Sequence, residues 1–198
     1  MILAALVLLL AADGFTPLFD GGTMAGWKEA EFPRHASVKV DDGALLLAAG
    51  APLTGVNLAR ADFPKSNYEV RFEAMKVQGG DFFASLTVPF KDSFCTFVTG
   101  GWGGDIVGLS SIDGWDASDN ETRSYFTFAT GRWYAFRMVV RDERIQGFID
   151  GKQVFDVPVG GRSIGLRPGD IKYSVPFGFA AYNTVGRIRK IEFRKLPV

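Results

Sequence analysis

The chain has 198 residues, with 22 Lys and Arg, 22 Asp and Glu and one His, so its formal net charge is zero. A balanced charge excludes nucleic acid as the default partner, because phosphate binding requires a basic excess. Hydrophobic residues make up 47% of the chain, enough to bury a core. With one cysteine and one histidine, the chain can form neither an intramolecular disulfide nor a structural zinc site built from four cysteines or from two cysteines and two histidines.

The first predicted element is an apolar run at residues 2–12, which Asp13-Gly14 ends. The run is shorter than the about 20 residues that a transmembrane helix needs. Its final pair of alanines is typical of a secretory cleavage region. No Lys or Arg precedes the run, so a buried N-terminal strand or helix is the alternative. We predict a signal peptide at 1–12 and one domain at 13–198, which is secreted, periplasmic or in the cell envelope and makes no stable membrane insertion after leader removal.

The remaining sequence alternates apolar residues with turn sequences. Apolar residues occupy every second position in 68–74 and again in 133–141, which is typical of strands with one buried face. The sequences Asp41-Asp42-Gly43 and Asp150-Gly151 predict tight hairpin turns between flanking strands. Further strands are predicted at residues 38–40, 45–47, 82–88, 94–99, 125–128, 144–149, 152–157, 177–182 and 187–193. The last of these requires a bulge near Arg189-Lys190 to keep its apolar residues on one face.

No window sustains a helical period over ten residues. The spacing of strands and turns therefore predicts an all-β fold, an antiparallel β-sandwich of the jelly-roll type with about a dozen strands. Cys95 lies beside Phe94 in a predicted strand, so a buried, unreactive thiol is expected there.

Residues 100–123 break the alternation with two Trp, four Asp, one Glu and six Gly. Trp102 and Trp115 offer flat apolar faces on which a sugar ring can stack, and the neighbouring carboxylates can accept hydrogen bonds from its hydroxyls. Glycines allow the backbone to approach a ligand closely. The alternative is an irregular loop whose Trp side chains plug one end of the sandwich. Because binding residues concentrate on loops of rigid scaffolds, we expect the functional site here.

Other chemistries find less support. His35 is the only imidazole and no Gly-x-Ser-x-Gly sequence is present, which disfavours a Ser-His-Asp triad. Asp113, Asp116 and Asp119 could ligate a divalent cation such as calcium, although the spacing is not that of an EF-hand, and an acidic solvated loop is the alternative. A pair of carboxylates could act as the acid of a glycosidase and as its nucleophile or base. The candidates for that pair are Asp81, Asp105, Asp113, Asp116 and Glu121.

Three segments resemble one protein family. Residues 15–27 are similar to its opening motif F-x-x-L-F-(D/N)-G-x-x-(L/M)-x-G-W. Residues 131–134 and 149–154 resemble its G-x-W strand and the (N/D)-G-x-x-V hairpin, and residues 188–196 resemble its closing strand. The chain thereby resembles the 3-keto-disaccharide hydrolase family, secreted bacterial proteins with a concanavalin A-like jelly-roll fold. In residues 79–98 the Glu and Gln of the family's E-x-Q strand have no match.

The resemblance implies a reaction at a 3-keto sugar, which needs a base, an electrophile for the enolate oxygen and an aromatic surface. Carbohydrate is the predicted partner. The predicted catalytic residues are Asp105, Asp113, Glu121 and Arg123, with Arg123 as the electrophile. The predicted substrate-binding residues are Trp102, Trp115, Phe83, Ser85, Thr87 and Asn120. Two alternatives remain, a non-catalytic glycan-binding module of the lectin or laminin-G kind and a cell-envelope interaction module.

Overall fold

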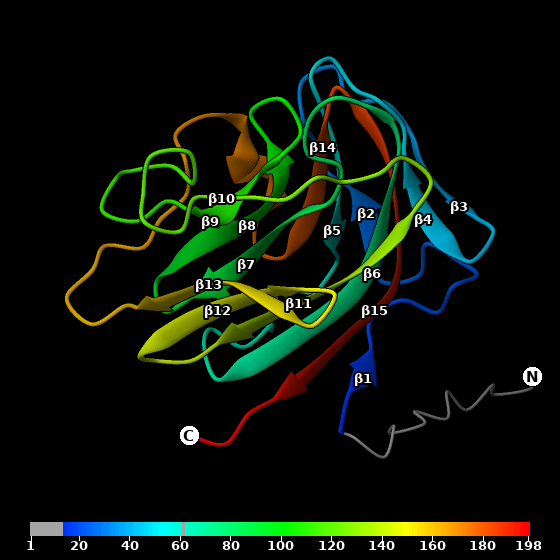
Figure 1. Ribbon diagram of the computed structural model, residues 1–198. Coiled ribbons are helices and arrows are strands. Elements are labelled where there is room, and N and C mark those ends of the chain that lie inside the picture. Colours follow the sequence, from blue (N-terminus) through cyan, green and yellow to red (C-terminus); the bar gives the residue numbers. More distant parts are fainter. Residues whose placement is uncertain (1–13, 61) are drawn as a thin grey trace, which may run out of the picture.

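The computed structural model describes residues 14–60 and 62–198 of the protein. Its strands form two antiparallel sheets that pack face to face, which confirms the predicted β-sandwich (Figure 1). The signal peptide predicted at 1–12 lies outside the described residues. Within the described ranges, no helix is long and apolar enough to cross a membrane.

One sheet contains eight strands. In chain order they are β1 (Thr16–Pro17), β3 (Val38–Asp41), β4 (Ala44–Leu47), β6 (Tyr68–Gly79), β11 (Trp133–Val140), β12 (Arg144–Ile149), β13 (Lys152–Pro158) and β15 (Thr184–Lys195). They lie in the order β13-β12-β11-β6-β15-β4-β3, and β1 pairs with β15. The first and last described strands are therefore neighbours.

The other sheet contains seven strands and carries the site described below. In chain order they are β2 (Trp27–Glu29), β5 (Leu53–Leu58), β7 (Ser85–Phe90), β8 (Ser93–Gly101), β9 (Ile106–Ser110), β10 (Ser124–Tyr125) and β14 (Gly178–Tyr182). Their order is β10-β9-β8-β7-β14-β5-β2. A short 3-10 helix, η1 (Asp170–Ser174), precedes β14 and contacts β5 and β14.

The turns follow their sequences. In the β3–β4 hairpin, Asp42 and Gly43 have φ angles of 46° and 73°. The β12–β13 turn repeats this geometry at Asp150-Gly151. Positive φ at both central residues belongs to the turn type whose twist matches that of paired strands, so both predicted hairpins are confirmed. The β6–β15 register shifts just after Arg189, where the predicted bulge is also confirmed.

The strand predictions were incomplete. No strand was predicted at β1, β2, β5 or β9, and the strand predicted at 125–128 shares only Tyr125 with the two-residue β10. Strand β5 is buried along its whole length and contains Gly and Asn, and β9 is interrupted by Gly108. Neither shows alternation, because both faces of these strands are covered. The strand predicted from residue 82 begins at Ser85.

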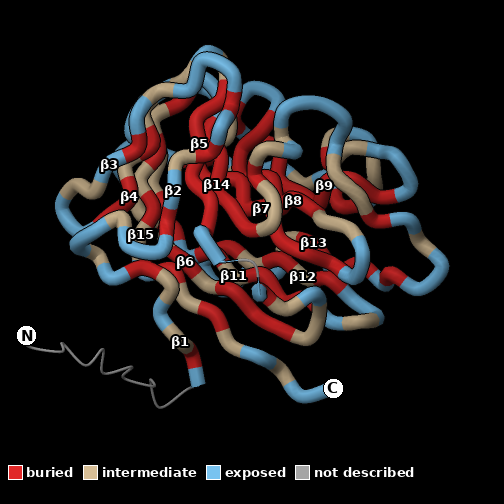
Figure 2. The backbone as a smooth tube through the Cα atoms, turned by 180° about the vertical axis from the view of Figure 1, so that it is seen from behind, coloured by how far each residue is buried: buried red, intermediate tan, exposed pale blue. Residues whose placement is uncertain are grey.

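Aromatic side chains from both sheets fill the core. The Phe72 and Phe136 rings stack at 5.0 Å, and the Phe179 ring meets Phe72 edge-on at 4.9 Å. Figure 2 shows buried residues along the central strands of both sheets and exposed residues in the connecting loops. Each such side chain contributes about 1.5–3 kcal/mol by its removal from water. The high Phe content of the chain therefore supplies a rigid scaffold.

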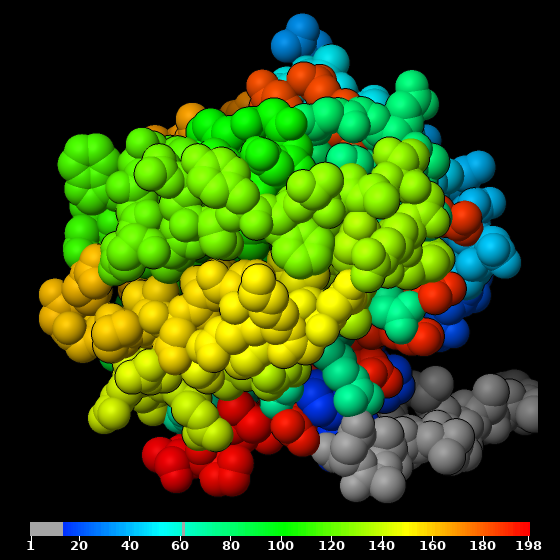
Figure 3. Space-filling model, viewed as in Figure 1, coloured from blue at the N-terminus to red at the C-terminus, as the bar shows by residue number. Residues whose placement is uncertain are grey.

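The segment between β10 and β11 crosses the front of the molecule from one sheet to the other (Figure 1). The space-filling view shows it packed against the neighbouring strands (Figure 3). Its Phe126 and Phe128 rings lie 5.6 and 5.1 Å from the ring of Tyr134 on β11. These contacts close this side of the sandwich.

Candidate functional site

The outer face of the seven-stranded sheet carries a pocket of about 410 Å³. On β7, Leu86 and Val88 point into the core, so strand alternation turns Ser85 outward. The register places Thr96 of β8 beside Ser110 of β9. Side-chain hydroxyls of Ser85, Thr96 and Ser110 thus line the pocket from three adjacent strands. Such a surface can both donate hydrogen bonds to a polar ligand and accept them.

Aromatic side chains flank these hydroxyls. Trp102 lies in the β8–β9 turn and lines the pocket together with Phe82 and Tyr182. The Phe82 and Tyr182 rings are 5.7 Å apart. Trp102 and Tyr182 are each 37% exposed, so part of both rings is available to a ligand. A sugar places its C–H face on such surfaces.

The glycines of the β8–β9 turn serve the turn itself. A Cβ atom on Gly100 would lie 2.9 Å from the carbonyl oxygen of Gly104, and one on Gly104 would lie 3.0 Å from that of Gly80. Both glycines have positive φ, at 89° and 107°. They allow the backbone to fold back on itself with Trp102 at the tip, rather than to approach a ligand as the sequence suggested.

Three charged side chains line the pocket, namely Asp81, Asp170 and Arg167. The Asp81 carboxylate accepts hydrogen bonds from the backbone N–H of Phe82 at 2.8 Å and of Gly103 at 3.2 Å. These bonds hold Asp81 against the turn that carries the aromatic side chain. Within residues 14–60 and 62–198, the Asp170 carboxylate makes no hydrogen bond or ion pair.

Arg167 connects the charged and aromatic parts of the pocket. Its Nε lies 3.2 Å from Asp116 Oδ2, and its guanidinium lies 5.5 Å from the centre of the Trp102 ring. Asp116 Oδ1 in turn accepts hydrogen bonds from the hydroxyls of Ser110 and Ser111 at 3.2 and 3.1 Å. These contacts join the segment after β13 to the loop after β9.

The structure places some predicted substrate-binding residues in this pocket and excludes others. Trp102 and Ser85 line it. Thr87 is on the same sheet face but does not line the pocket, and its hydroxyl lies 2.9 Å from that of Thr96. The prediction for Phe83 is wrong, because this ring points into the core, where it is fully buried against Phe128. Phe83 follows the pocket residue Phe82, and neighbouring side chains on an extended chain face opposite sides of the sheet.

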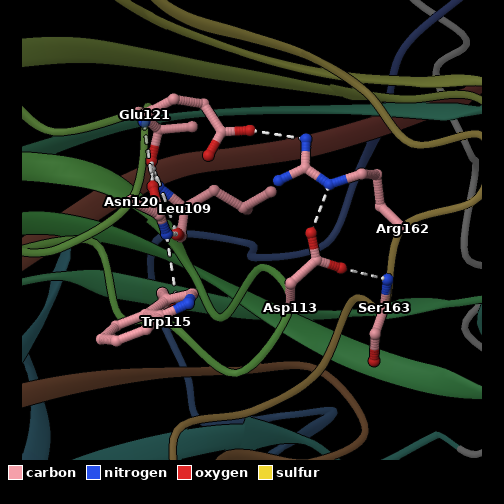
Figure 4. Close-up of polar contacts among 8 residues, drawn as sticks. Leu109, Asp113, Trp115, Asn120, Glu121, Arg162 and Ser163 are labelled. Atoms are coloured by element: carbon pink, nitrogen blue, oxygen red, sulfur yellow. Dashed lines mark hydrogen bonds and ion pairs between the residues drawn. The ribbon is translucent and has the colours of Figure 1, made fainter.

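Two predicted catalytic carboxylates, Asp113 and Glu121, meet outside the pocket on Arg162 (Figure 4). Arg162 Nε lies 2.5 Å from Asp113 Oδ2, and its Nη1 lies 2.7 Å from Glu121 Oε1. Hydrogen bonds from the Ser163 backbone N–H and from Arg162 lower the pKa of Asp113. The bond from Arg162 likewise lowers the pKa of Glu121. These carboxylates are thereby held as anions in ion pairs that bridge two loops.

The other predicted residues of the loop are also outside the pocket. Asp105 is exposed, and Arg123 donates a hydrogen bond to the carbonyl oxygen of Ser118 at 2.9 Å. The Asn120 amide bonds to the carbonyl oxygens of Leu109 and Trp115, as Figure 4 shows. Asn120 thus stabilises the loop. Trp115 is 63% exposed and separate from the pocket.

The residues predicted to ligate a cation do not fit one site. Asp113 is paired with Arg162, Asp116 with Arg167, and Asp119 with the hydroxyl of Ser118. Among the residues that the structure describes, no group of three His, Cys, Asp or Glu side chains converges. Each carboxylate interacts with a different side chain, so Asp113, Asp116 and Asp119 do not form the predicted metal site.

The sequence did not reveal six of the polar, charged or aromatic residues that line the pocket, namely Arg167, Asp170, Tyr182, Phe82, Thr96 and Ser110. The first two lie in an irregular segment, Arg167-Pro168-Gly169-Asp170, whose sequence indicates only a turn. Tyr182 is the last residue of β14, and nothing in the sequence around it indicated that its side chain lies on the outer face of the sheet. Asp81 was recognised only as one of five candidate carboxylates.

The two packed sheets and the pocket on one of them define a β-sandwich domain of the jelly-roll type. The family model of the 3-keto-alpha-glucoside-1,2-lyase-like domain matches residues 14–196, so the chain belongs to this family. The match confirms the resemblance found in the three sequence motifs. No match was found among curated proteins.

Solved structures with the same fold come from carbohydrate-active proteins. A proposed glycosyl hydrolase from Parabacteroides distasonis has a TM-score of 0.60 at 14% identity, covering 94% of this chain and 96% of its own. The carbohydrate-binding module CBM66 from Bacillus subtilis has a TM-score of 0.57 at 10% identity, with coverages of 86% and 96%. Domain 4 of AbnA, a GH43 extracellular arabinanase from Geobacillus stearothermophilus in complex with arabinotriose, has a TM-score of 0.57 at 16% identity, with coverages of 85% and 82%. At these identities the likeness concerns the fold.

Proposed function

We propose that this domain is an enzyme that cleaves a 3-keto-glycoside in the pocket on the outer face of the seven-stranded sheet. One observation carries the proposal: a carboxylate, a guanidinium and an aromatic ring, those of Asp81, Arg167 and Trp102, line one pocket that also contains hydroxyl groups. Its volume of about 410 Å³ is typical of small-molecule sites. Family membership supports the reaction class.

The reaction uses the acidity that a ketone at C3 gives to the proton at C2. A base removes this proton, and the C2–H electrons move toward O3, which becomes an enolate oxygen. When the carbonyl re-forms, the C1–O bond breaks, a C1–C2 double bond forms, and the leaving alkoxide takes up a proton. Water then adds across the double bond, so that cleavage is hydrolytic overall.

The residues of the pocket can take the roles that this reaction needs. Asp81 is the proposed base, because two backbone N–H groups fix its orientation before a substrate arrives. Arg167 is the proposed electrophile, since a guanidinium stabilises a developing enolate charge. Trp102 and Tyr182 provide the aromatic surfaces. These roles replace those predicted for Asp105, Asp113, Glu121 and Arg123.

The test compares Asp81→Asn with Asp105→Asn, a matched change at an exposed carboxylate outside the pocket. With a 3-keto-α-glucoside as substrate, Asp81→Asn should lower kcat by at least about 100-fold, the usual contribution of a general base. Asp105→Asn should leave kcat and KM unchanged. Equal turnover by wild type and Asp81→Asn would remove Asp81 from the mechanism.

A second candidate function is glycan binding without catalysis. The hydroxyls of Ser85, Thr96 and Ser110 and the ring of Trp102 suffice to bind a sugar, and one protein with this fold is a carbohydrate-binding module. Tryptophan fluorescence titration with glucosides and their 3-keto derivatives separates the two functions. Saturable binding of both ligands, with no turnover of the 3-keto sugar, would establish the binding module.

The proposal includes export of the domain, which the apolar run at residues 2–12 predicts. Mass spectrometry of the protein from the culture medium or periplasm of an expressing bacterium would test it. Export predicts a mature chain that begins near Asp13, and recovery of the uncleaved chain from the cytoplasm alone would contradict it.

A further inference from the structure

The charges around the pocket are unbalanced. Asp81 and Asp170 line it as carboxylates, and among the described residues Arg167 is the one cation that lines it. Arg167 is already paired with Asp116 at 3.2 Å. Two carboxylates and one guanidinium that is already paired therefore line the pocket, which gives it a negative potential toward a ligand.

Asp170 is the carboxylate best placed to act on a ligand. Asp81 accepts two backbone hydrogen bonds. Asp170 has no hydrogen-bond or ion-pair partner within the described part of the chain. The ammonium group of Lys172, which is in the same 3-10 helix, lies 5.3 Å from the centre of the Tyr173 ring. The Asp170 carboxylate is therefore available to an incoming cation.

The aromatic side chains favour the same kind of ligand. The faces of Trp102 and Tyr182 are partly exposed in the pocket, and aromatic faces attract ammonium groups. The guanidinium of Arg167 already makes such a contact with Trp102 at 5.5 Å. A neutral sugar can use the hydroxyls and the rings, whereas a sugar with an ammonium group can also use Asp170.

We propose that this pocket selects glycosides that carry an ammonium group, the glycosides of amino sugars, over neutral glycosides and over uronic acid glycosides. The selection rests on the proposed function of the pocket as a sugar site. Asp170 acts as the specificity-determining residue, through a charge contact with the sugar ammonium. The carboxylate of a uronic acid meets the same negative potential and is disfavoured.

Three probes that differ mainly in charge test the proposal, namely the methyl glycosides of glucosamine, glucose and glucuronic acid. Binding is measured by isothermal titration at pH 6 and low salt, where carboxylates are ionised and the sugar amine is protonated. One partly exposed ion pair should make the glucosaminide bind about twofold to fivefold more tightly than the glucoside. The glucuronide should bind more weakly than the glucoside. Added salt should reduce both differences, because it screens exposed charges.

Asp170→Asn is the decisive variant, since it keeps the shape of the side chain and removes its charge. It should bring the affinities for the glucosaminide and the glucoside together. Asp105→Asn makes the same charge change outside the pocket and should keep the wild-type preference. Equal binding of the three probes by wild type, or an unchanged preference in Asp170→Asn, would overturn charge selection and leave the sugar site standing. Absence of binding by all three would overturn the proposed selection, whereas the proposed cleavage is judged separately by turnover of the 3-keto-α-glucoside.

Discussion

Replacement of Glu69 by glutamine should destabilise the protein more than any comparable change at its surface. Glu69 is on the central strand β6 and is 3% exposed. Its carboxylate accepts one hydrogen bond from Arg137 at 3.2 Å and two from Arg194 at 2.9 and 2.7 Å. Glutamine keeps the shape and one acceptor oxygen, but it presents an amide donor to guanidinium donors.

The size of the effect follows from this burial. Loss of one partner from a buried ion pair costs about 3–5 kcal/mol. Here the two arginine side chains are 40% and 35% exposed, so water can solvate them after the change. We therefore expect a loss of about 2 kcal/mol, which lowers Tm by roughly 4–8 °C for a domain of this size.

Urea unfolding followed by tryptophan fluorescence measures this loss as a fall in the midpoint with an unchanged slope. Glu192→Gln is the matched control, because Glu192 pairs with Arg71 on the same sheet but its side chain is 24% exposed. It should cost less than about 1 kcal/mol. Equal losses in the two variants would refute the reasoning that burial decides the size. Sugar binding should stay the same in both, since neither residue contacts the pocket.

Three further outcomes are expected. Burial opposes ionisation of Glu73, but hydrogen bonds from Lys190 and Arg189 outweigh it and lower the folded-state pKa. The stability that this group contributes is present above about pH 4.3, the ordinary value for Glu, and is lost as pH falls through the lower folded-state pKa. Glu73→Gln should therefore make the acid limb of stability against pH shallower, and an identical acid limb would contradict this. Burial raises the pKa of the Cys95 thiol to about 12. Ellman's reagent should therefore react with this thiol only in urea. Rapid reaction of the native protein would show instead that the thiol is accessible. Phe83→Ala should cost about 3–5 kcal/mol in urea unfolding, as a cavity in an aromatic core does, without a change in sugar affinity of the folded protein. A specific loss of affinity would instead support the predicted contact between Phe83 and sugar.

Much of the fold could be predicted because strands and hairpin turns each have a characteristic pattern in the local sequence. The alternation in residues 68–74 and 133–141 reports one buried face, and the turn sequence Asp150-Gly151 reports positive φ angles. These properties depend on residues close together in the chain. Strands β5 and β9 escaped prediction because neighbouring segments cover both of their faces, which removes the alternation.

The site was predicted only in part, because its members come from distant loops. Residues 100–123 do contribute Trp102 and Ser110 to the pocket. Arg167 and Asp170 reach the same pocket from the segment between β13 and β14. That meeting depends on β14 pairing with β7, a contact between residues that are about 90 positions apart. The residues near each of these positions in the sequence do not indicate that the two strands pair.

The sequence by itself determined the all-β class, the hairpins, the family and the presence of an acidic, tryptophan-bearing loop. Only the tertiary structure decided what the acids of that loop do. Asp113 and Glu121 have the residue type of catalytic carboxylates, but Arg162, from a loop more than 40 residues away in the chain, lies between them and takes both as ion-pair partners. Asp81 and Asp170 keep access to the pocket because no cation of the described chain pairs with them. A carboxylate's chemistry depends on the charges that the fold brings to it, and these are set by long-range packing.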